Sequence, residues 1–465
     1  MGEPRSIRTW PVPDRGLGNS SYLAEVADGV ALAVDPGRDP RPYLEVAAAN
    51  GLRIAFTADT HVHADFVSGS RELAGLGARL LAPAGSMLSF PHEQLFDGED
   101  LDLGGLTLRP LATPGHTPEH LAYLLLDGGT PVAVFTGGAL ISGGVARTDL
   151  GGAANAETWT RAAYRSARSL LDALPEELAV FPTHGPGSFC SAGETGGHAT
   201  TIGREKTGNP LLAGGDEEAF TVRLLAGLGS YPAYFDRMPA LNRQGVPRHG
   251  ITRPPLAKLT AAHVAELADE GATIVDARPI AAFAAAHIPG SLSNALRPAF
   301  TTWLGWLADP DKPLAVVLDP GQDRGELTEA CLKAGYDNLA GELDGGLDAW
   351  QAAGLPTVSI PLFDPDSLYT QHRCDVLDVR QLAEWESGHL PGAIHAELGS
   401  LRDAAVSARL PDGALAVMCG HGERAMTAAS LLGDASVASL SVLRGSPADW
   451  ANAAGQYLEP TCPPS

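Results

Sequence analysis

The sequence predicts an α/β protein of three domains. These are an α/β sandwich at residues 1–245 and two smaller α/β domains with parallel sheets at residues 255–355 and 363–460. Three observations support this prediction. The chain has 465 residues, which is too many for one hydrophobic core. The first half alternates apolar runs with polar loops, and the second half holds two copies of one unit of about a hundred residues.

Five short apolar runs in the first half are typical of strands that end at polar or Gly-rich turns. They are residues 31–34, 54–57, 107–111, 131–136 and 178–181. Loops that contain histidine follow several of these runs, which favours a sandwich whose strand-end loops carry a site. We expect residues 238–254, which are polar with several Pro and Arg, to be a linker, and residues 353–365 to be a shorter one.

The second half is an internal repeat. Asp-Ala-Arg at 276–278 and His-Ile-Pro-Gly at 287–290 recur as Asp-Val-Arg at 378–380 and His-Leu-Pro-Gly at 389–392. The offset is 102 residues (276 to 378), and Trp350 and Trp450 repeat with an offset of 100. Each copy opens with an apolar strand, at 272–275 and at 376–377, and then alternates strands with helical stretches. That alternation predicts βαβ units on a parallel sheet.

The composition of the chain limits the partners that it can bind and the cellular compartment in which we expect it. The net charge of −23 would repel nucleic acid and anionic membrane surfaces, so we expect neither as a partner. No run of about 18 apolar residues is present, and the N-terminus lacks an apolar secretory core. Five cysteines in so long a chain do not make a disulfide framework. A cytoplasmic, reducing location is expected, while the oligomeric state stays open, a homo-oligomer included.

Three separate loops present imidazoles at predicted strand ends. His61 and His63 follow residues 54–57, with Asp65 two positions further on, while His116 and His184 lie in two Gly-containing loops. Two histidines at i and i+2, plus one from each of two other loops, form a common ligand set for zinc or iron. The alternative, scattered polar loop histidines, explains less well why three of the four adjoin Gly or Asp turns.

These loops belong to a larger set of motifs that resembles the metallo-β-lactamase superfamily, and within it the persulfide dioxygenases. The resemblance covers about the first 245 residues and implies an αββα sandwich. It also implies one iron held by two histidines, here His61 and His116, and by an aspartate. The further motifs are Asn19–Tyr22, Asp35–Gly37, Gly144–Asp149, His184–Ser188 with Cys190, Thr201–Gly203, Tyr231–Phe235 and Arg237–Pro239.

Two positions depart from the family pattern. Phe66 stands where the superfamily has a histidine, and Gly138 stands where it has the metal-binding aspartate. A site that loses a carboxylate ligand loses one bond and one negative charge. The resemblance therefore implies Fe(II) that is weakened or absent, with zinc the lesser alternative. Asp65 could substitute for the carboxylate, or His63 could complete a three-histidine site. Dinuclear hydrolysis fits less well, because both departures remove ligands that it needs.

The loop around Cys419 carries a second chemistry. It follows an apolar strand, 414–418, and precedes a helical stretch, 425–432. At such a turn, backbone N–H groups and the helix N-terminus favour a thiolate, the nucleophilic form. Gly420 and Gly422 let the backbone curl around the sulfur, and Arg424 adds positive charge for an anionic sulfur donor. The alternative is a buried structural cysteine, the commoner fate of a free thiol.

The pattern Cys-x-x-Gly-x-Arg at 419–424 resembles the active loop of rhodanese domains. That resemblance implies sulfane-sulfur transfer through a persulfide on Cys419. In the first copy, Asp319 stands at the matching position and Pro320 removes a backbone donor, so this copy is expected to be inactive. We expect Asp378 and Arg380 to form a structural pair and Cys331 to lie in a core.

Three functions stay open on these residues. The protein could couple a persulfide dioxygenase to a sulfurtransferase, or act as a sulfurtransferase on a scaffold domain. It could also be a non-catalytic persulfide carrier or regulator. All three involve Cys419 and a small-molecule persulfide, thiosulfate or low-molecular-weight thiol.

Overall fold

The computed structural model describes residues 7–192, 196–365, 375–411, 413–433, 439–455 and 457–460, and it confirms the α/β class. The chain divides into two compact units. Unit 1 comprises Met1–Pro254 with Glu329–Asp337, and unit 2 comprises Pro255–Thr328 with Asn338–Ser465.

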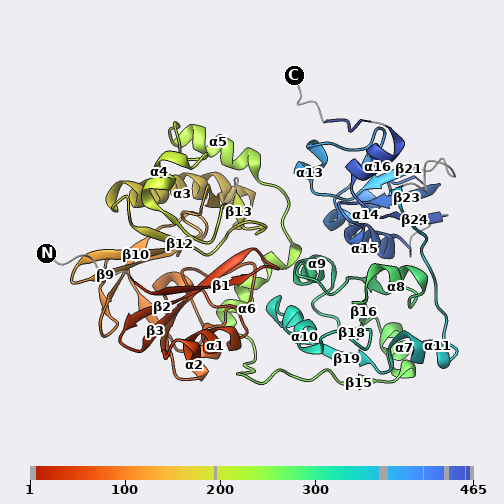
Figure 1. The fold of residues 1–465 in the computed structure, drawn as a ribbon, viewed down its shortest axis with the longest axis horizontal. Helices are drawn as coiled ribbons and strands as arrows, with labels where there is room; N and C mark the ends of the chain where they lie inside the picture. Colours follow the sequence, from red (N-terminus) through yellow and green to blue (C-terminus); the bar gives the residue numbers. More distant parts are fainter. Residues whose placement is uncertain are drawn as a thin grey trace. The chain divides into compact units, whose positions relative to one another are not determined.

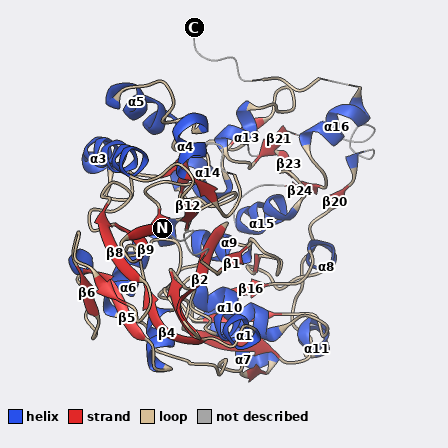
Figure 2. Ribbon diagram, turned by 60° about the vertical axis from the view of Figure 1, so that its left-hand side comes forward, coloured by secondary structure: helices blue, strands red, loops and turns tan. Residues whose placement is uncertain are grey.

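Unit 1 contains two six-stranded sheets (Figures 1 and 2). The first has the order β1-β2-β3-β4-β5-β6, antiparallel from β1 to β3 and parallel from β3 to β6. Its strands are β1 Thr9–Asp14, β2 Asn19–Ala27, β3 Val30–Val34, β4 Arg53–Ala58, β5 Arg79–Pro83 and β6 Glu93–Leu95. Its helical segments are α1 Arg41–Ala49, α2 Ser70–Gly75 and η1 Ala84–Ser86.

The second sheet has the order β14-β12-β10-β9-β8-β7. β11 and β13 form a separate two-stranded sheet. Its strands are β7 Leu101–Asp102, β8 Thr107–Ala112, β9 Leu121–Asp127, β10 Thr130–Gly137, β12 Ala179–Pro182 and β14 Thr200–Thr201. The small pair is β11 Val145–Ala146 and β13 Ser191–Ala192. The remaining helices of this part are α3 Ala153–Ala173, α4 Ile202–Gly208, α5 Glu217–Gly227, η2 Ala233–Asp236 and α6 Met238–Gln244.

Alternation along the strands places one side of each sheet against the other sheet and one side against helices. In β2, Tyr22 joins the core between the sheets, together with Phe135 of β10, while Leu23 joins the cluster under α1. In the second sheet, Val134 packs with Leu170 of α3. Successive residues of a strand point to opposite faces, so these runs are buried on both sides. The five predicted strands of this half are confirmed as β3, β4, β8, β10 and β12.

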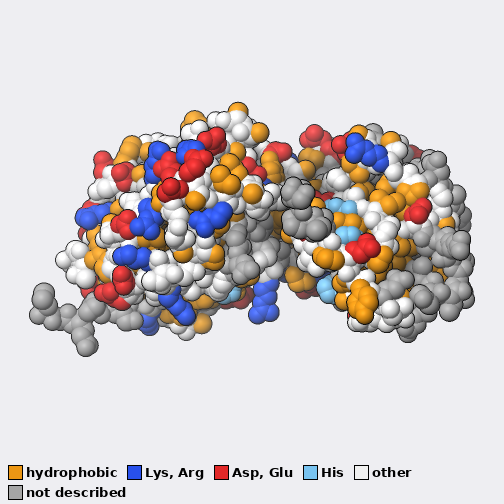
Figure 3. Space-filling view, turned by 90° about the horizontal axis from the view of Figure 1, so that it is seen from above, with side chains coloured by type: hydrophobic (Ala, Val, Ile, Leu, Met, Phe, Trp, Pro, Cys, Tyr) orange, Lys and Arg blue, Asp and Glu red, His pale blue; other side chains and the backbone are white. Residues whose placement is uncertain are grey.

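The outer face formed by α3 and α5 carries mixed charges. Arg161 pairs with Glu157 and Glu218, and Arg165 pairs with Glu217. Figure 3 shows basic and acidic side chains side by side on this part of unit 1. Although the net charge of the chain is −23, this face carries both positive and negative side chains.

The first predicted linker is wrong for its N-terminal half. Residues 238–244 form α6, which begins at Met238 and buries Met238 and Asn242. Pro239 lies in its first turn, where proline is tolerated. The amide of Asn242 donates to the carbonyl oxygens of His63 (2.8 Å) and Phe66 (2.9 Å). A helix in this place holds the His61–Phe66 loop, which sequence periodicity over seven residues could not reveal.

Unit 2 contains two five-stranded sheets with the same topology, which confirms the repeat. Their orders are β15-β19-β18-β16-β17 and β20-β24-β23-β21-β22, and every pairing is parallel. The first sheet comprises β15 Lys258–Leu259, β16 Thr273–Asp276, β17 Leu292–Ser293, β18 Leu314–Val317 and β19 Leu339–Leu343. The second comprises β20 Leu362–Phe363, β21 Asp375–Asp378, β22 Ile394–His395, β23 Ala414–Met418 and β24 Ser439–Leu443.

Helices connect these strands as the βαβ pattern predicts. The first repeat has α7 Ala261–Asp269, α8 Ile280–Ala285, α9 Phe300–Leu307, α10 Arg324–Lys333 and α11 Gly346–Ala352. The second has α13 Leu382–Glu386, η3 Leu398–Ser400, α14 Ala404–Ser407, α15 Glu423–Leu432 and α16 Pro447–Ala454. The second predicted linker is wrong at its end, because β20 lies within it and pairs with β24.

The Asp–Arg motif is a buried ion pair in both repeats, as expected. The Arg278 side chain donates three hydrogen bonds to Asp276 and one to the carbonyl of Ala286. Arg380 makes the same contacts with Asp378 and the carbonyl of Gly388. Each pair therefore ties the end of a strand to the turn after the next helix. Within the described residues, no helix is both long and apolar enough to span a membrane.

Candidate functional site

Three histidines meet at the strand ends of unit 1. His61 follows β4, His116 follows β8 and His184 follows β12. All three are buried, and each offers a ring nitrogen within 4.8 Å of the others. Their ring centroids lie 4.7 Å (His61–His116), 5.1 Å (His116–His184) and 5.5 Å (His61–His184) apart. The third imidazole beside His61 and His116 is thus His184.

Hydrogen bonds at Nδ1 fix the tautomer of all three rings. Nδ1 of His116 donates to the carbonyl of Arg147 (2.7 Å), and Nδ1 of His184 lies 3.1 Å from the Asn19 carbonyl oxygen. Nδ1 of His61 lies 2.8 Å from Thr60 Oγ1, whose own proton goes to Asp35. Each Nδ1 is therefore the protonated nitrogen, and each Nε2 carries a free lone pair.

The three Nε2 atoms are buried and have no hydrogen-bond partner. A buried polar atom without a partner costs about 1–3 kcal/mol, so three in one place call for a ligand. Burial, reinforced by neighbouring histidines, lowers the pKa of His61 well below its usual value. Burial likewise lowers the pKa of His116 and of His184 to about 3. Neutral imidazoles with converging lone pairs fit a divalent metal ion, which needs unprotonated ligands.

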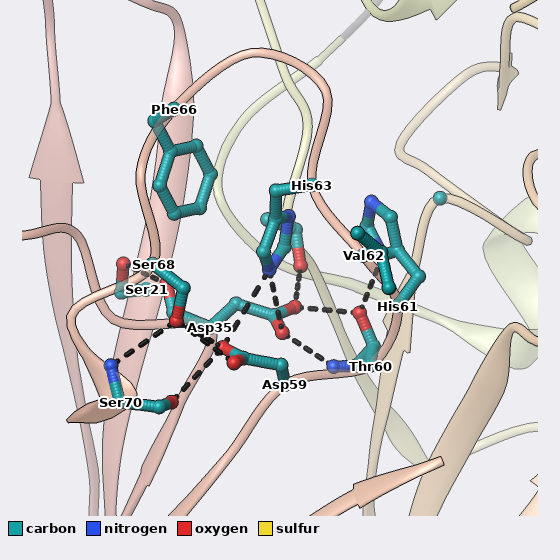
Figure 4. Close-up of polar contacts among 12 residues, drawn as sticks. Ser21, Asp35, Asp59, Thr60, His61, Val62, His63, Phe66, Ser68 and Ser70 are labelled. Atoms are coloured by element: carbon teal, nitrogen blue, oxygen red, sulfur yellow. Dashed lines mark hydrogen bonds and ion pairs between the residues drawn. The ribbon is translucent and has the colours of Figure 1, made fainter. Parts of the chain in front are cut away.

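His63 lies against His61, with ring centroids 4.2 Å apart, but its Nε2 faces two carboxylates. Its Nε2 lies 3.2 Å from Asp35 Oδ1 and 3.8 Å from Asp59 Oδ1, and its ring stacks on Phe66 with the centroids 4.3 Å apart. Figure 4 shows the His63 ring directed toward these two carboxylates. Burial alone would lower the pKa of His63, but Asp35 and Asp59 outweigh it and raise that pKa to about 9. The two carboxylates therefore favour the protonated form of His63.

Asp35 organises the loop that carries His61. Its carboxylate accepts from Thr60 N (2.6 Å), Thr60 Oγ1 (2.8 Å), Thr183 Oγ1 and His63. Its backbone lies in the left-handed region, with φ 49°. One carboxylate thereby ties the β4 loop to the β12 loop, which are far apart in the chain.

Asp65 lies beside His184, with its Oδ2 3.5 Å from His184 Nδ1. Asn19 Nδ2 donates to its Oδ2 at 2.5 Å, and its Oδ1 is buried without a partner. Asp65, His184 and Cys190 also offer ligand atoms within 4.8 Å of one another. Burial, followed by the charge of Asp65, raises the pKa of the Cys190 thiol well above its usual value.

The space for a carboxylate at position 138 is taken. A Cβ atom on Gly138 would lie 2.7 Å from Cδ2 of His116 and 2.8 Å from Cβ of Ala146. The His116 ring therefore packs against the glycine backbone, and an aspartate side chain could enter only if that ring moved.

The sequence did not single out His120 as part of this group. Its ring stacks on His61 at 5.0 Å, its Nδ1 bonds Thr113 Oγ1 (2.8 Å), and its Nε2 accepts from Gly138 N (2.9 Å). With both nitrogens bonded, His120 supports His61. Its position four residues after His116, inside the same loop, was the available signal.

In unit 2, the Cys419 loop joins β23 to α15. Cys419 is 1% exposed, and the N–H of Gly422 donates to its sulfur at 3.1 Å. Gly422 has φ 112°, a left-handed conformation that favours glycine. Gly420 is partly exposed, and a Cβ atom on Gly420 would lie 3.5 Å from Arg424 Nη2. The four residues expected at this loop thus lie together.

Arg424 is engaged by a carboxylate. Its Nη1 and Nη2 donate to the two oxygens of Glu384 at 2.6 and 2.7 Å. Burial alone would lower the pKa of Arg424, but the bonds to Glu384 raise it. A bidentate pair of this kind cancels most of the arginine's charge.

The corresponding loop of the first repeat is built differently. Arg324 Nη1 donates to the carbonyl oxygens of Asp319 (2.8 Å), Pro320 (3.1 Å) and Gln322 (2.6 Å). Arg324 Nε pairs with Glu342 at 3.0 Å. Carbonyl groups therefore face inward and hold a cation. Cys331, in α10, is fully buried, and burial raises its pKa to about 12.

Known proteins resemble parts of this chain. The Rhodanese-like domain family matches residues 260–353 and 365–453. A hydroxyacylglutathione hydrolase of Methylobacillus flagellatus is 41% identical over 122 residues, 26% of this chain and 46% of that protein. The mitochondrial persulfide dioxygenase ETHE1 of Homo sapiens is 29% identical over 194 residues, 40% of this chain and 68% of that protein.

A crystal structure of a metallo-beta-lactamase from Staphylococcus aureus subsp. aureus COL matches with a TM-score of 0.63 and 27% identity. That match covers 73% of this chain and 99% of the other. The chain spans only 46% and 60% of the first two hydroxyacylglutathione hydrolases that it matches. The protein therefore combines a metallo-β-lactamase fold with two rhodanese-like domains. Within that class, its first unit is similar to persulfide dioxygenases. These relatives, together with the converging imidazoles, indicate a metal site in unit 1.

Proposed function

We propose that this protein acts in sulfane-sulfur metabolism as a rhodanese-type sulfurtransferase with Cys419 as the nucleophile. One observation carries the proposal: the Gly422 N–H group donates to the Cys419 sulfur at the N-terminus of α15. A hydrogen bond to the sulfur and the positive end of a helix both favour the thiolate over the thiol.

The transfer step needs no oxidant. The Cys419 thiolate attacks the outer sulfur of a donor such as thiosulfate, a new S–S bond forms, and the donor's S–S bond breaks. Its electron pair leaves on sulfite, and Cys419 carries a persulfide. A thiol or cyanide then attacks the outer sulfur of this persulfide, its S–S bond breaks, and the electron pair returns to Cys419 as the thiolate. Because Cys419 is only 1% exposed, the outer sulfur of the donor has to enter the loop, which favours small donors over protein-bound ones.

Mass analysis of cysteine peptides after incubation with thiosulfate tests this assignment. The Cys419 peptide should gain one sulfur atom while an equal amount of sulfite is released. Cys331 is a matched control within the same chain, because it is equally buried and burial raises its pKa to about 12. Equal loading of both peptides, or of neither, would contradict the assignment.

We further propose that His61, His116 and His184 hold one divalent metal ion through Nε2. The three partnerless Nε2 atoms support this set. Asp35, His61 and His63 also offer ligand atoms within 4.8 Å of one another, but Nε2 of His63 lies 3.2 Å from Asp35 and only its Nδ1 lacks a partner. Similarity to persulfide dioxygenases favours Fe(II), with zinc as the alternative. Bound iron would supply a centre for oxidising a thiol-bound persulfide, beside which Asp65 and Asn19 orient His184.

Metal analysis of protein from iron-supplemented cells, with oxygen uptake on glutathione persulfide, tests this second proposal. We expect near-stoichiometric iron, lost in His184→Ala and kept in His63→Gln. Iron kept in His184→Ala but lost in His63→Gln would reverse the ligand assignment. No metal in the unaltered protein would leave unit 1 as a scaffold and Cys419 as the remaining chemistry.

Hydrolysis of the kind named for the hydroxyacylglutathione hydrolases is the weaker candidate. Two-metal hydrolysis needs a second set of ligands. Here Phe66 packs on His63, and Gly138 has no room for a side chain.

A further inference from the structure

Unit 1 contains a cavity of about 400 Å³ that is distinct from the histidine group and from the Cys419 loop. Its walls come from β1 and the start of β2, from the segment between β3 and α1, from residues 249–254 and from the end of α10. All of these residues belong to unit 1, which includes Glu329–Asp337. A cavity of this size can enclose a small organic molecule.

Two side chains in the wall contact the histidine group from outside. The Oδ1 atom of Asn19 lies 3.1 Å from His184 Nδ1. Phe66 stacks on His63, and Figure 4 shows the Phe66 ring on the far side of His63 from His61. The cavity is therefore next to the proposed metal site but is a different site.

Arg38 lines the cavity with a donor that the protein itself does not use. Its side chain is only 5% exposed. Nη1 donates to the carbonyl of Leu332 (2.8 Å), Nη2 donates to the carbonyl of Pro247 (3.0 Å), and both donate to Asp337. The remaining donor, Nε–H, is buried and has no hydrogen-bond partner. Buried N–H groups without an acceptor are rare in folded proteins, so this one indicates an acceptor supplied by a ligand.

The other charges of the wall favour an anion as that ligand. Arg15 is exposed and forms no ion pair within the part of the chain that the structure describes. The carboxylates of the wall, in contrast, all have partners. Asp14 pairs with Lys333, Asp39 with Arg41 and Glu329 with Arg253, and Glu72 accepts from the N–H groups of His249 (3.0 Å) and Gly250 (2.8 Å).

We propose that this cavity binds a small amphipathic organic anion. Its carboxylate or sulfonate group accepts from Nε–H of Arg38 and lies within the field of Arg15, while its apolar part packs on the buried side chains of Leu17 and Leu332. The site needs neither a bound metal nor the Cys419 thiolate. It therefore goes beyond the functions proposed above, and its test does not depend on theirs.

Two dyes that differ in charge test the proposal by fluorescence titration of the full chain. Anilinonaphthalene sulfonate is an anion with an apolar body, and phenylnaphthylamine is the same molecule without the sulfonate. Arg15→Gln should raise the Kd of the sulfonate dye about two- to fivefold, because solvent screens an exposed charge, and should leave the Kd of the neutral dye unchanged. Arg38→Lys removes the Nε–H group and should raise the Kd of the sulfonate dye about tenfold.

A third variant fills the cavity without changing any charge. A Cβ atom on Gly37 would meet only Tyr43 Oη within 4 Å, at 3.6 Å, and both residues line the cavity. Gly37→Leu should therefore raise the Kd of both dyes about tenfold or more. Arg38 also holds two backbone carbonyl groups, so Arg15→Gln and Gly37→Leu decide the outcome if Arg38→Lys does not fold.

Arg204→Gln is the matched control, because Arg204 is an exposed arginine of α4 outside the cavity wall, and it should change neither Kd. Binding of the sulfonate dye that Gly37→Leu leaves unchanged would overturn the proposal. Equal effects of Arg15→Gln on the two dyes would also overturn it, because the site would then not select an anion.

Discussion

Residues 319–324 and 419–424 are the same loop in two copies of one fold, and they present opposite polarity to the space that they enclose. In the second copy an N–H group points at the Cys419 sulfur. In the first copy three carbonyl groups point at Arg324. One loop can stabilise an anion and the other already holds a cation.

Single residues account for the difference. Gly422 adopts φ 112°, which lets its N–H turn inward, whereas the matching position in the first repeat is Gln322. The Gln322 side chain instead accepts from Asp319 N (2.8 Å) and donates to the carbonyl of Ala277 (2.7 Å). The sheet order and the Asp–Arg pair are the same in both copies. The two loops thus differ in what they can bind, although the sheets and the Asp–Arg pairs that support them are the same.

The largest expected effect is loss of the nucleophile. Cys419→Ser should lower thiosulfate:cyanide turnover on the order of a thousandfold or more, because no other described group can carry the persulfide at this loop. The comparison also predicts that a cysteine alone does not make a site. Asp319→Cys in the Cys419→Ser background should stay inactive, because its loop presents carbonyl groups. Recovered turnover there would break the comparison.

A smaller effect is expected at the shared scaffold. Asp276→Asn and Asp378→Asn each leave a buried arginine without its counter-ion, which typically costs about 3–5 kcal/mol. Both variants should lower the midpoint of urea unfolding of unit 2 by similar amounts. A loss confined to one repeat would show that the two scaffolds are not equivalent.

The matched pairs Arg424–Glu384 and Arg324–Glu342 sharpen the comparison further. Glu384→Gln removes the charge that neutralises Arg424, so the KM for thiosulfate should fall about two- to fivefold. Glu342→Gln makes the same change beside Arg324 and should leave the KM unaltered. Equal effects of the two variants on the KM would contradict the difference in polarity.

The smallest effect concerns acid stability. Burial alone would raise the pKa of Glu384, but its bonds to Arg424 outweigh burial and lower that pKa. Stability from this pair is therefore present above the unfolded-state pKa and is lost as the pH falls through the lower folded-state pKa. Because Glu384 is 42% exposed, the contribution should stay under about 1 kcal/mol. Glu384→Gln should flatten the acid limb of stability slightly, as measured by urea unfolding at several pH values.

Local sequence predicted much of this architecture. Apolar runs marked β3, β4, β8, β10 and β12, and β23 begins and ends where it was expected. Repeated motifs predicted two copies of one parallel-sheet unit. These signals succeed because strand period, turn residues and repeats act over a few positions.

Other features depend on contacts between distant residues. Residues 238–244 were expected to belong to a linker but form α6, whose Asn242 bonds a loop 176 residues earlier. Sequence left open whether His63 or Asp65 completes the metal site, because ring direction is set by Asp35 and Asp59. Arg424 was expected to face the donor, whereas Glu384, 40 residues earlier, holds it.

By itself the sequence determined the fold class, the repeat, the lone cysteine in a glycine-containing loop and the histidine loops at strand ends. The tertiary structure alone decided which imidazoles converge and which cations are already paired. The physical reason is that residue type and spacing determine what a side chain can bond. Which of the possible partners lies within bonding distance depends on how the folded chain brings distant segments together.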